Sequence, residues 1–202
     1  MFRNRIHAGM LLARKLKKFK NTGAVILAIP RGGVPVACII ATKLYCHMEL
    51  ILSKKIGHPA NKEYAIGAAS LTDHFIIPHT KVTANYITQE IANVRARLVE
   101  MQDRFLLYKK ENLTGKVILL VDDGIATGNT LLSTVQLISK NNPSKVIIAV
   151  PVASRSAVIM LSNFVDEIIV LNIPSQFYGV GAFYNDFTQV TDEEVIFYLD
   201  KM

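Results

Sequence analysis

The sequence predicts an α/β fold built on an open, mostly parallel sheet with helices on both faces. Two apolar runs without polar alternation indicate it: residues 117–121 (Val-Ile-Leu-Leu-Val) and 146–150 (Val-Ile-Ile-Ala-Val). Strands of this kind are buried on both faces, as parallel strands between two helix layers are. The third observation is size. A chain of 202 residues, 50% of them hydrophobic and 19% charged, fits one globular domain over residues 1–202.

Each element is predicted from its own spacing and composition. Helices are expected where apolar residues recur three or four positions apart, and strands where short apolar runs end at turn residues. Gly57, Pro59 and Asn61 favour a flexible loop over residues 54–65. The expected order is a basic helix at 5–19, strand 24–29, helix 34–45, strand 49–53, the loop, strands 66–70 and 74–77, helix 82–108, strand 116–121, turn 122–128, helix 130–139, strand 145–150, helix 153–161 and strand 167–171.

The net charge of +7 comes from one short segment. Residues 1–20 hold seven Lys or Arg and no acid, and the other 182 residues hold 16 basic and 16 acidic groups. Because no domain-wide basic groove follows, and no basic run is interleaved with aromatic residues, we expect no nucleic-acid partner. The basic helix is expected to cover the core with its apolar stripe; a membrane-surface or targeting role is the alternative.

The sequence predicts a cytoplasmic protein, because it shows no pattern of a targeting signal and its two cysteines are not spaced for a disulfide. The longest unbroken apolar run, residues 34–41, is far shorter than the roughly 20 residues of a membrane span, so no membrane partner is expected. No secretory signal pattern begins the chain. On one helix, Cys38 and Cys46 would lie about 12 Å apart, too far for a disulfide, and are expected to be reduced.

The turn after residues 117–121 carries the chemistry. Two carboxylates, Asp122 and Asp123, are followed by Gly124-Ile-Ala-Thr-Gly-Asn-Thr130, which opens a helix. A helix N-terminus suits a phosphate, and Gly128 lets the backbone approach one closely. Carboxylates accept hydrogen bonds from sugar hydroxyls and can bind Mg²⁺. The turn therefore predicts a sugar-phosphate site.

Two other interpretations fit this turn less well. A P-loop needs four residues between its glycines and then a lysine. Here three residues separate Gly124 from Gly128, and Asn129 stands at the lysine position. A purely structural turn would need one Asp as a helix cap. It does not explain the second acid or the run Ala-Thr-Gly-Asn-Thr that follows.

Residues 117–130 resemble the signature of type I phosphoribosyltransferases, which bind 5-phosphoribosyl 1-diphosphate (PRPP). Pro-Arg-Gly-Gly at 30–33 resembles the diphosphate loop of that family, and residues 54–63 its flexible catalytic loop. Nearly the whole chain resembles a bacterial branch of predicted phosphoribosyltransferases. Four stretches carry this closer resemblance: residues 2–9, 30–37, 65–68 and 177–190.

The resemblance implies a role for each matching residue. Asp122 and Asp123 would hold the ribose hydroxyls and help seat Mg²⁺, and Lys55 would reach the diphosphate from the loop. Lys54 stands where the branch usually has Arg. The implied substrate-binding residues are Arg31, Gly32, Asp122, Asp123, Gly124, Ala126, Thr127, Gly128, Asn129 and Thr130; the implied catalytic residues are Lys55, Arg31, Asp122 and Asp123.

The implied reaction is Mg²⁺-dependent transfer of the phosphoribosyl group from PRPP to a base or amine, with release of diphosphate. The alternative is a PRPP-binding regulatory protein with little or no turnover. Ala126 replaces an Asp of 6-oxopurine enzymes, which argues against hypoxanthine or guanine as acceptor. The resemblance also implies a homodimer and a small hood, assigned to residues 172–190. The aromatic rings of that hood would stack on a base, or pack in the core or a dimer contact.

Overall fold

A five-stranded parallel sheet forms the centre of the computed structural model, which describes residues 1–77, 82–105 and 111–202. The strand order is β2-β1-β6-β7-β8. Their bounds are Val25–Ala28 for β1, His47–Leu50 for β2, Val117–Val121 for β6, Lys145–Val152 for β7 and Glu167–Asn172 for β8. The parallel α/β architecture predicted from the apolar runs is confirmed.

Alternate residues of β6 explain why both faces of the sheet are covered. Leu119 and Val121 belong to the core cluster that includes residues of the helices α1, α2 and α6. Ile118 and Leu120 belong to a second cluster, with residues of α4 and α5. All four side chains are fully buried. The helices are α1 (Arg5–Lys15), α2 (Gly33–Leu44), α4 (Asn129–Ser139), α5 (Arg155–Leu161) and α6 (Asp192–Leu199).

A separate antiparallel sheet corrects the prediction of a loop at 54–65. Strands β3 (Ser53–His58) and β4 (Asn61–Ser70) form a hairpin, and β5 (His74–Ile76) joins it at the far edge of β4. Gly57 was taken as a loop residue, but it lies where two strands approach closely: a Cβ there would lie 2.8 Å from Cα of Lys62. The expected strand 49–53 is likewise divided between β2 and β3.

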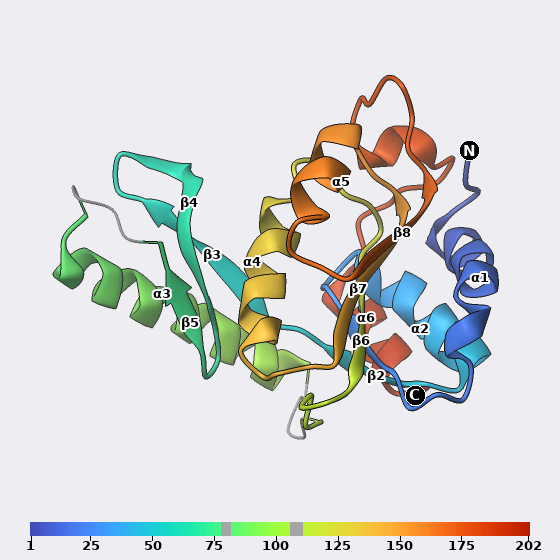
Figure 1. Cartoon of the computed structure of the whole chain (residues 1–202), viewed down its shortest axis with the longest axis horizontal. Helices are drawn as coiled ribbons and strands as arrows, with labels where there is room; N and C mark the ends of the chain where they lie inside the picture. The colour runs from blue at the N-terminus through green and yellow to red at the C-terminus, as the bar shows by residue number, and fades with distance from the viewer. Residues whose placement is uncertain (78–81, 106–110) are drawn as a thin grey trace.

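The hairpin and helix α3 (Ala84–Arg104) project together to one side of the five-stranded sheet (Figure 1). Helix α3 was expected at 82–108, and its last predicted residues lie outside the described ones. Buried Ile56 of β3 and Leu98 of α3 belong to the main core cluster, so this projecting part is packed onto the rest of the chain.

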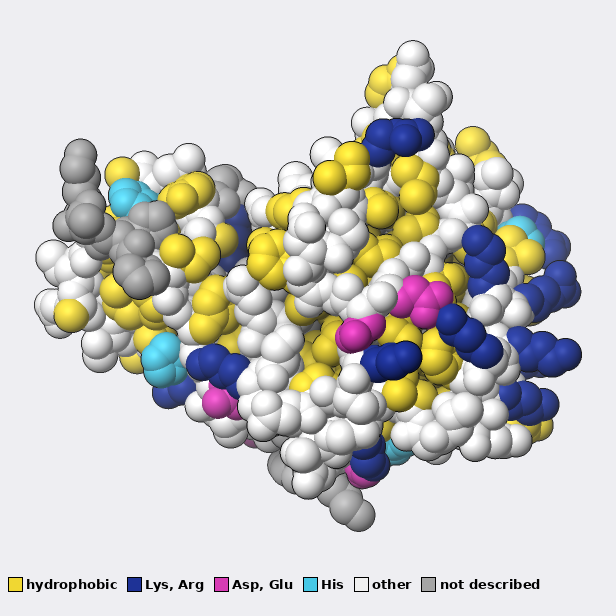
Figure 2. Space-filling model, in the orientation of Figure 1, with side chains coloured by type: hydrophobic (Ala, Val, Ile, Leu, Met, Phe, Trp, Pro, Cys, Tyr) yellow, Lys and Arg dark blue, Asp and Glu magenta, His cyan; other side chains and the backbone are white. Residues whose placement is uncertain are grey.

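The N-terminal basic segment is a helix followed by a short 3₁₀ turn at Lys17–Phe19, rather than one helix over 5–19. Buried Ala8, Leu12 and Ala13 confirm that its apolar stripe covers the core. Figure 2 shows Lys and Arg side chains gathered at the edge of the molecule where Figure 1 places α1. None of the helices in the described residues is long and apolar enough to span a membrane. Cys38 and Cys46 are both buried and free, as expected.

Candidate active site

Neighbouring strands bring the two predicted ligand loops together. Val121, the last residue of β6, pairs with Ala28, the last residue of β1. The amide of Ile29 then donates a hydrogen bond to the carbonyl oxygen of Val121 at 3.0 Å. The Pro-Arg-Gly-Gly turn and the Asp-Asp turn therefore leave the sheet side by side at its carboxyl edge, where ligands of open α/β sheets bind.

The glycines of the first loop lie directly against the two acids. A Cβ built on Gly32 would lie 2.7 Å from Cγ of Asp123, and closer still to its Oδ2. A Cβ on Gly33 would lie 2.9 Å from Cα of Asp122. Real Cβ atoms essentially never make such contacts. Only glycine at these two positions lets the loop backbone reach the acid pair. The peptide bond between Pro30 and Arg31 is cis.

Burial makes the ionised forms of Asp122 and Asp123 less stable. Desolvation and the neighbouring Asp123 charge raise the pKa of Asp122 well above its usual value. Desolvation also raises the pKa of Asp123, although a hydrogen bond and the positive charge of Arg5 oppose the shift. The amide of Asp123 donates a hydrogen bond to Oδ1 of Asp122 at 2.8 Å. Two carboxylates held so close are costly unless cations or donors meet them.

The cation that meets Asp123 comes from the N-terminal helix. Nε of Arg5 donates a hydrogen bond to Oδ2 of Asp123 at 2.8 Å. The Tyr184 hydroxyl donates to the backbone carbonyl oxygen of Asp123 at 2.6 Å. Burial is the largest cause that raises the pKa of Tyr184, so this hydroxyl stays a donor. Neither Arg5 nor Tyr184 was among the predicted site residues, although both lie in stretches that resemble the bacterial branch.

The predicted phosphate turn is anchored at Ile125 and Ala126, and most of its residues are exposed. Ile125 forms a β-bridge with Ala153, and the Ser154 hydroxyl donates to the carbonyl oxygen of Ala126 at 2.6 Å. Gly128 has φ +80° and caps helix α4, a conformation that favours glycine. The predicted phosphate ligands other than Gly128 are exposed, namely Ala126, Thr127, Asn129 and Thr130. The amides at this helix start can therefore receive an anion from solvent.

Arg31 lies at the rim of the same edge. Its Nη1 is 3.6 Å from Oδ1 of Asp192, and 36% of its side chain is exposed. Asp192 also pairs with Arg104 of α3. Asp192 thus ties the first turn of α6 to two other parts of the chain. Sequence reasoning made no prediction for α6, although the Thr191-x-x-Glu194 capping box gives it a clear start signal.

Lys54 and Lys55 lie on the antiparallel sheet, not on the five-stranded one. They pair with Ala69 and Ala68 of β4, respectively. Because successive strand residues point to opposite faces, only one of the two lysines can face a given ligand. The Ser53 and Thr134 hydroxyls are 2.8 Å apart, so the base of the hairpin contacts the helix that begins at the phosphate turn.

The aromatic rings of the C-terminal segment largely contact one another. Phe177 and Phe183 stack with centroids 5.6 Å apart, and Tyr184 contacts Phe2 at 5.2 Å and Phe187 at 4.9 Å. The stretches at the two ends of the chain therefore pack together. Of the two interpretations left open, packing describes these rings. Tyr178 differs from these rings, because 79% of its surface is exposed.

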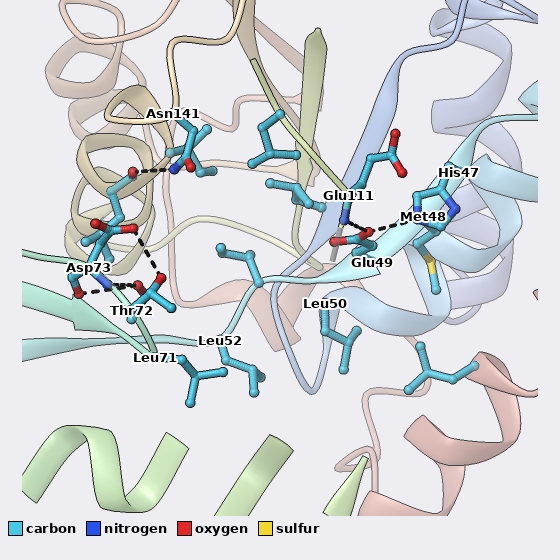
Figure 3. Close-up of a pocket in the computed structure, with 17 residues that line it drawn as sticks. His47, Met48, Glu49, Leu50, Leu52, Leu71, Thr72, Asp73, Glu111 and Asn141 are labelled. Carbon is cyan, nitrogen blue, oxygen red and sulfur yellow. Dashed lines mark hydrogen bonds and ion pairs between the residues drawn. The ribbon is translucent and has the colours of Figure 1, made fainter. Parts of the chain in front are cut away.

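A cavity of about 530 Å³ lies away from these residues, between β2, the β4–β5 turn and the end of α4 (Figure 3). At one side, His47, Glu49 and Glu111 converge, with His47 Nε2 2.9 Å from Glu49 Oε1. The Glu111 amide donates to the same oxygen at 2.5 Å. These bonds join the segment at Glu111 to the edge strand. None of the predicted site residues lines this cavity.

Comparisons with known proteins agree with the predicted family. Residues 4–184 match the sequence model of the phosphoribosyl transferase domain. Two relatives, from Mycobacterium tuberculosis strains CDC 1551 and H37Rv, carry the provisional name phosphoribosyl transferase. Each is 32% identical over 207 aligned positions, which cover 100% of this chain and 47% of the relative. The chain thus spans about half the length of these curated relatives.

Solved structures agree with this comparison. The crystal structure of TT1426 from Thermus thermophilus is 36% identical, with a TM-score of 0.92, and covers 99% of this chain and 98% of that one. A Bacillus anthracis hypoxanthine-guanine phosphoribosyltransferase shares the fold at 14% identity and a TM-score of 0.50, covering 91% and 88% of the two chains. The fold and the match over residues 4–184 show that this chain belongs to the phosphoribosyl transferase domain family.

Proposed function

We propose that this chain transfers a 5-phosphoribosyl group from PRPP to a nitrogenous base or amine and releases diphosphate. The contact of Gly32 with the Asp123 carboxylate carries the proposal, because it joins a backbone loop suited to diphosphate with acids suited to ribose hydroxyls. The open start of α4 follows the acids directly in the chain. One edge of the sheet thus offers places for the three parts of PRPP.

Each part of PRPP has chemically matched partners. Residues 126–130 would hold the 5′-phosphate through helix-start amides and threonine hydroxyls. Asp122 and Asp123 would accept hydrogen bonds from the ribose hydroxyls, and Gly124 would keep the turn between the two groups compact. Arg31 and the Gly32 amide would bind the diphosphate. Lys55, carried by the β3–β4 hairpin, would add a further charge to the leaving group.

The donor set at the acid pair fits Mg²⁺, which prefers carboxylate oxygens together with water and substrate phosphates. Asp122 and Asp123 would hold the ion together with oxygens of PRPP. When bound, Mg²⁺ would supply positive charge next to the departing diphosphate.

Charge development defines what the protein groups do during the transfer. The bond from the ribose C1 to diphosphate lengthens as the acceptor nitrogen approaches, so C1 gains positive charge and the leaving group negative charge. Arg31 and Lys55 would stabilise the leaving group, and the two carboxylates the cationic sugar. The β3–β4 hairpin would move as one unit and exclude water from PRPP, although it is a hairpin and not an irregular loop.

The acceptor would be recognised near the C-terminal segment, where Tyr178 offers an exposed ring. Ala126 in place of an acid disfavours a 6-oxopurine acceptor. We expect the protein to act as a cytoplasmic homodimer, which light scattering during size-exclusion chromatography tests. The second candidate is a PRPP-binding regulator, which would use the same loops without turnover.

Thermal unfolding with Mg²⁺ and PRPP tests the site. At 100 times Kd, a ligand adds about 2.7 kcal/mol to the free energy of unfolding. For a domain of this size, that corresponds to a rise of about 5–10 °C in Tm. The rise should disappear in Asp122→Asn/Asp123→Asn and persist in Asp103→Asn, a neutralised acid on the exposed surface of α3.

The absence of a Tm shift in the unsubstituted protein at millimolar PRPP would refute the proposal. Where PRPP binds, diphosphate release against a panel of bases and amines separates the enzyme from the regulator. Release above the rate of PRPP hydrolysis with at least one acceptor identifies an enzyme. PRPP binding without release for any acceptor favours the regulator.

A further inference from the structure

Arg5 places a positive charge inside the predicted ribose site. Its Nε lies 2.8 Å from Oδ2 of Asp123, and only 11% of the Arg5 side chain and 13% of that of Asp123 are exposed. The two residues are separated by 118 positions in the sequence. This ion pair is therefore a long-range, largely desolvated contact, unlike the exposed pairs that contribute little in most proteins.

The Arg5 guanidinium is held from its other side as well. It lies 3.9 Å from the centroid of the Phe187 ring, and Nη1 donates to the carbonyl oxygen of Thr188 at 2.7 Å. Three partners, a carboxylate, a ring and a carbonyl, thus fix one planar group. A guanidinium fixed in this way is pre-organised and need not rearrange when a ligand arrives.

Arg5 makes the two carboxylate oxygens of Asp123 different from each other. Arg5 donates to Oδ2 of Asp123, while none of the side chains that the structure describes donates a hydrogen bond to Oδ1. One oxygen is thus held and the other is available to a hydroxyl donor. The Arg5 charge also offsets one of the two negative charges that would attract a divalent cation. A dication between the acids would lie within a few ångströms of the guanidinium and be repelled by it.

We propose that Arg5 is a positioning residue that fixes Asp123 for a sugar hydroxyl and keeps a free divalent cation from binding the acid pair. The metal would then bind only when the ligand's own oxygens complete its coordination. The part of this inference that concerns the ribose rests on the proposed function. The exclusion of free metal does not, because it concerns only the residues of this chain.

Binding of Mn²⁺ alone tests the exclusion directly. We would follow free Mn²⁺ by electron paramagnetic resonance, without PRPP, in the unsubstituted protein and in Arg5→Met, Arg5→Lys and Arg14→Met. Met keeps an unbranched apolar chain against Phe187 and removes the charge. Arg14, on the exposed side of the same helix, is the matched control for loss of one positive charge.

Arg5→Met should bind Mn²⁺ at least about tenfold more tightly than the unsubstituted protein. Arg14→Met should stay within about threefold of it. Arg5→Lys keeps the positive charge and should therefore gain less Mn²⁺ affinity than Arg5→Met does. Adding Asp123→Asn to Arg5→Met should remove the gain. Equal Mn²⁺ affinity in Arg5→Met and the unsubstituted protein would overturn the exclusion, as would a gain that survives Asp123→Asn.

Calorimetry with PRPP and Mg²⁺ tests the positioning. Arg5→Met should weaken binding by about tenfold or more, and Arg5→Lys, which keeps the charge but not the planar group, should recover part of the loss. A purely structural role would lower the urea midpoint and leave both binding constants unchanged, and that result would overturn the proposal. If the unsubstituted protein binds no PRPP, the proposed function fails, whereas the Mn²⁺ comparison still decides whether Arg5 excludes metal.

Discussion

Gly32→Ala is the smallest change that separates the two ligand loops. Gly32 has φ −61° and ψ −34°, a conformation that alanine adopts without strain. The new methyl group would nevertheless lie 2.7 Å from Cγ of Asp123. Because Arg5 anchors this carboxylate, the side chain cannot move without stretching or breaking that hydrogen bond. The effect of the substitution is therefore steric and confined to the Gly32–Asp123 contact.

The broken contact sets the size of the effect. A hydrogen bond to a charged group contributes about 1.5–3 kcal/mol. We expect Gly32→Ala to lower the free energy of unfolding by about this amount, which corresponds to a fall in Tm of roughly 3–12 °C at this chain length. Displacement of Asp123 should also weaken PRPP binding by about tenfold or more, since 1.4 kcal/mol corresponds to a factor of ten.

A double-mutant cycle isolates the contact. Urea unfolding would be measured for Gly32→Ala, Asp123→Ala and the double variant. Asp123→Ala removes the atoms that the new methyl group meets, so Gly32→Ala should cost less than about 0.5 kcal/mol in that background. A similar cost in both backgrounds would show that the strain lies elsewhere in the loop. No cost in either background would refute the geometry.

Three further outcomes follow from individual contacts. The pKa of Asp122 is raised in the folded state, so the free energy of unfolding falls as the pH rises from the pKa of the unfolded chain toward the raised pKa. Asp122→Asn should reduce this fall, which urea unfolding at pH values from 4 to 8 measures. Asp192→Asn removes the ion pair with Arg31 and should strengthen the binding of inorganic diphosphate about threefold, as measured by calorimetry. Unchanged diphosphate affinity would show that Arg31 does not bind diphosphate. Thr191→Ala removes the capping box and should cost about 1 kcal/mol of unfolding free energy, whereas exposed Thr72→Ala should cost less.

The elements between residues 116 and 172 could be predicted closely, because they depend on local patterns. The run of apolar residues at 117–121 requires cover on both faces, and the core clusters on the two sides of β6 provide it. The turn from Asp122 to Gly128 was recognised because acids, glycines and threonines at fixed spacing have a direct chemical meaning. Strand–turn–helix order and residue types were sufficient there.

The first half was harder to predict because its elements depend on contacts between strands. Residues 54–65 have the composition of a loop, yet they form most of a hairpin whose Ile56 side chain is fully buried. Gly57 indicated flexibility by composition, whereas its position is set by the approach of Lys62 on the opposite strand. Propensity carries no information about such partners.

The largest gap in the sequence prediction concerned electrostatics. Arg5 was counted within the basic N-terminal segment, but its charge is directed inward, at Asp123. Lys18 also has a partner within the chain, at the surface, with Nζ 2.7 Å from Oε2 of Glu167 at the start of β8. Lys15 of α1 likewise donates from Nζ to the carbonyl oxygen of Val170 in β8 at 3.1 Å. Part of the charge of this segment therefore binds it to the sheet, and net charge alone could not show which groups these are.

The two ends of the chain meet at the acid pair. Phe2 and Arg5 at one end, and Tyr184 and Phe187 at the other, form a continuous set of contacts that ends at Asp123. The ring pairs exclude water from the ion pair, and exclusion of water strengthens the hold of Arg5 on the carboxylate. A signature confined to residues 117–130 identifies the acids, but their charge and geometry depend on side chains more than 50 positions away in either direction.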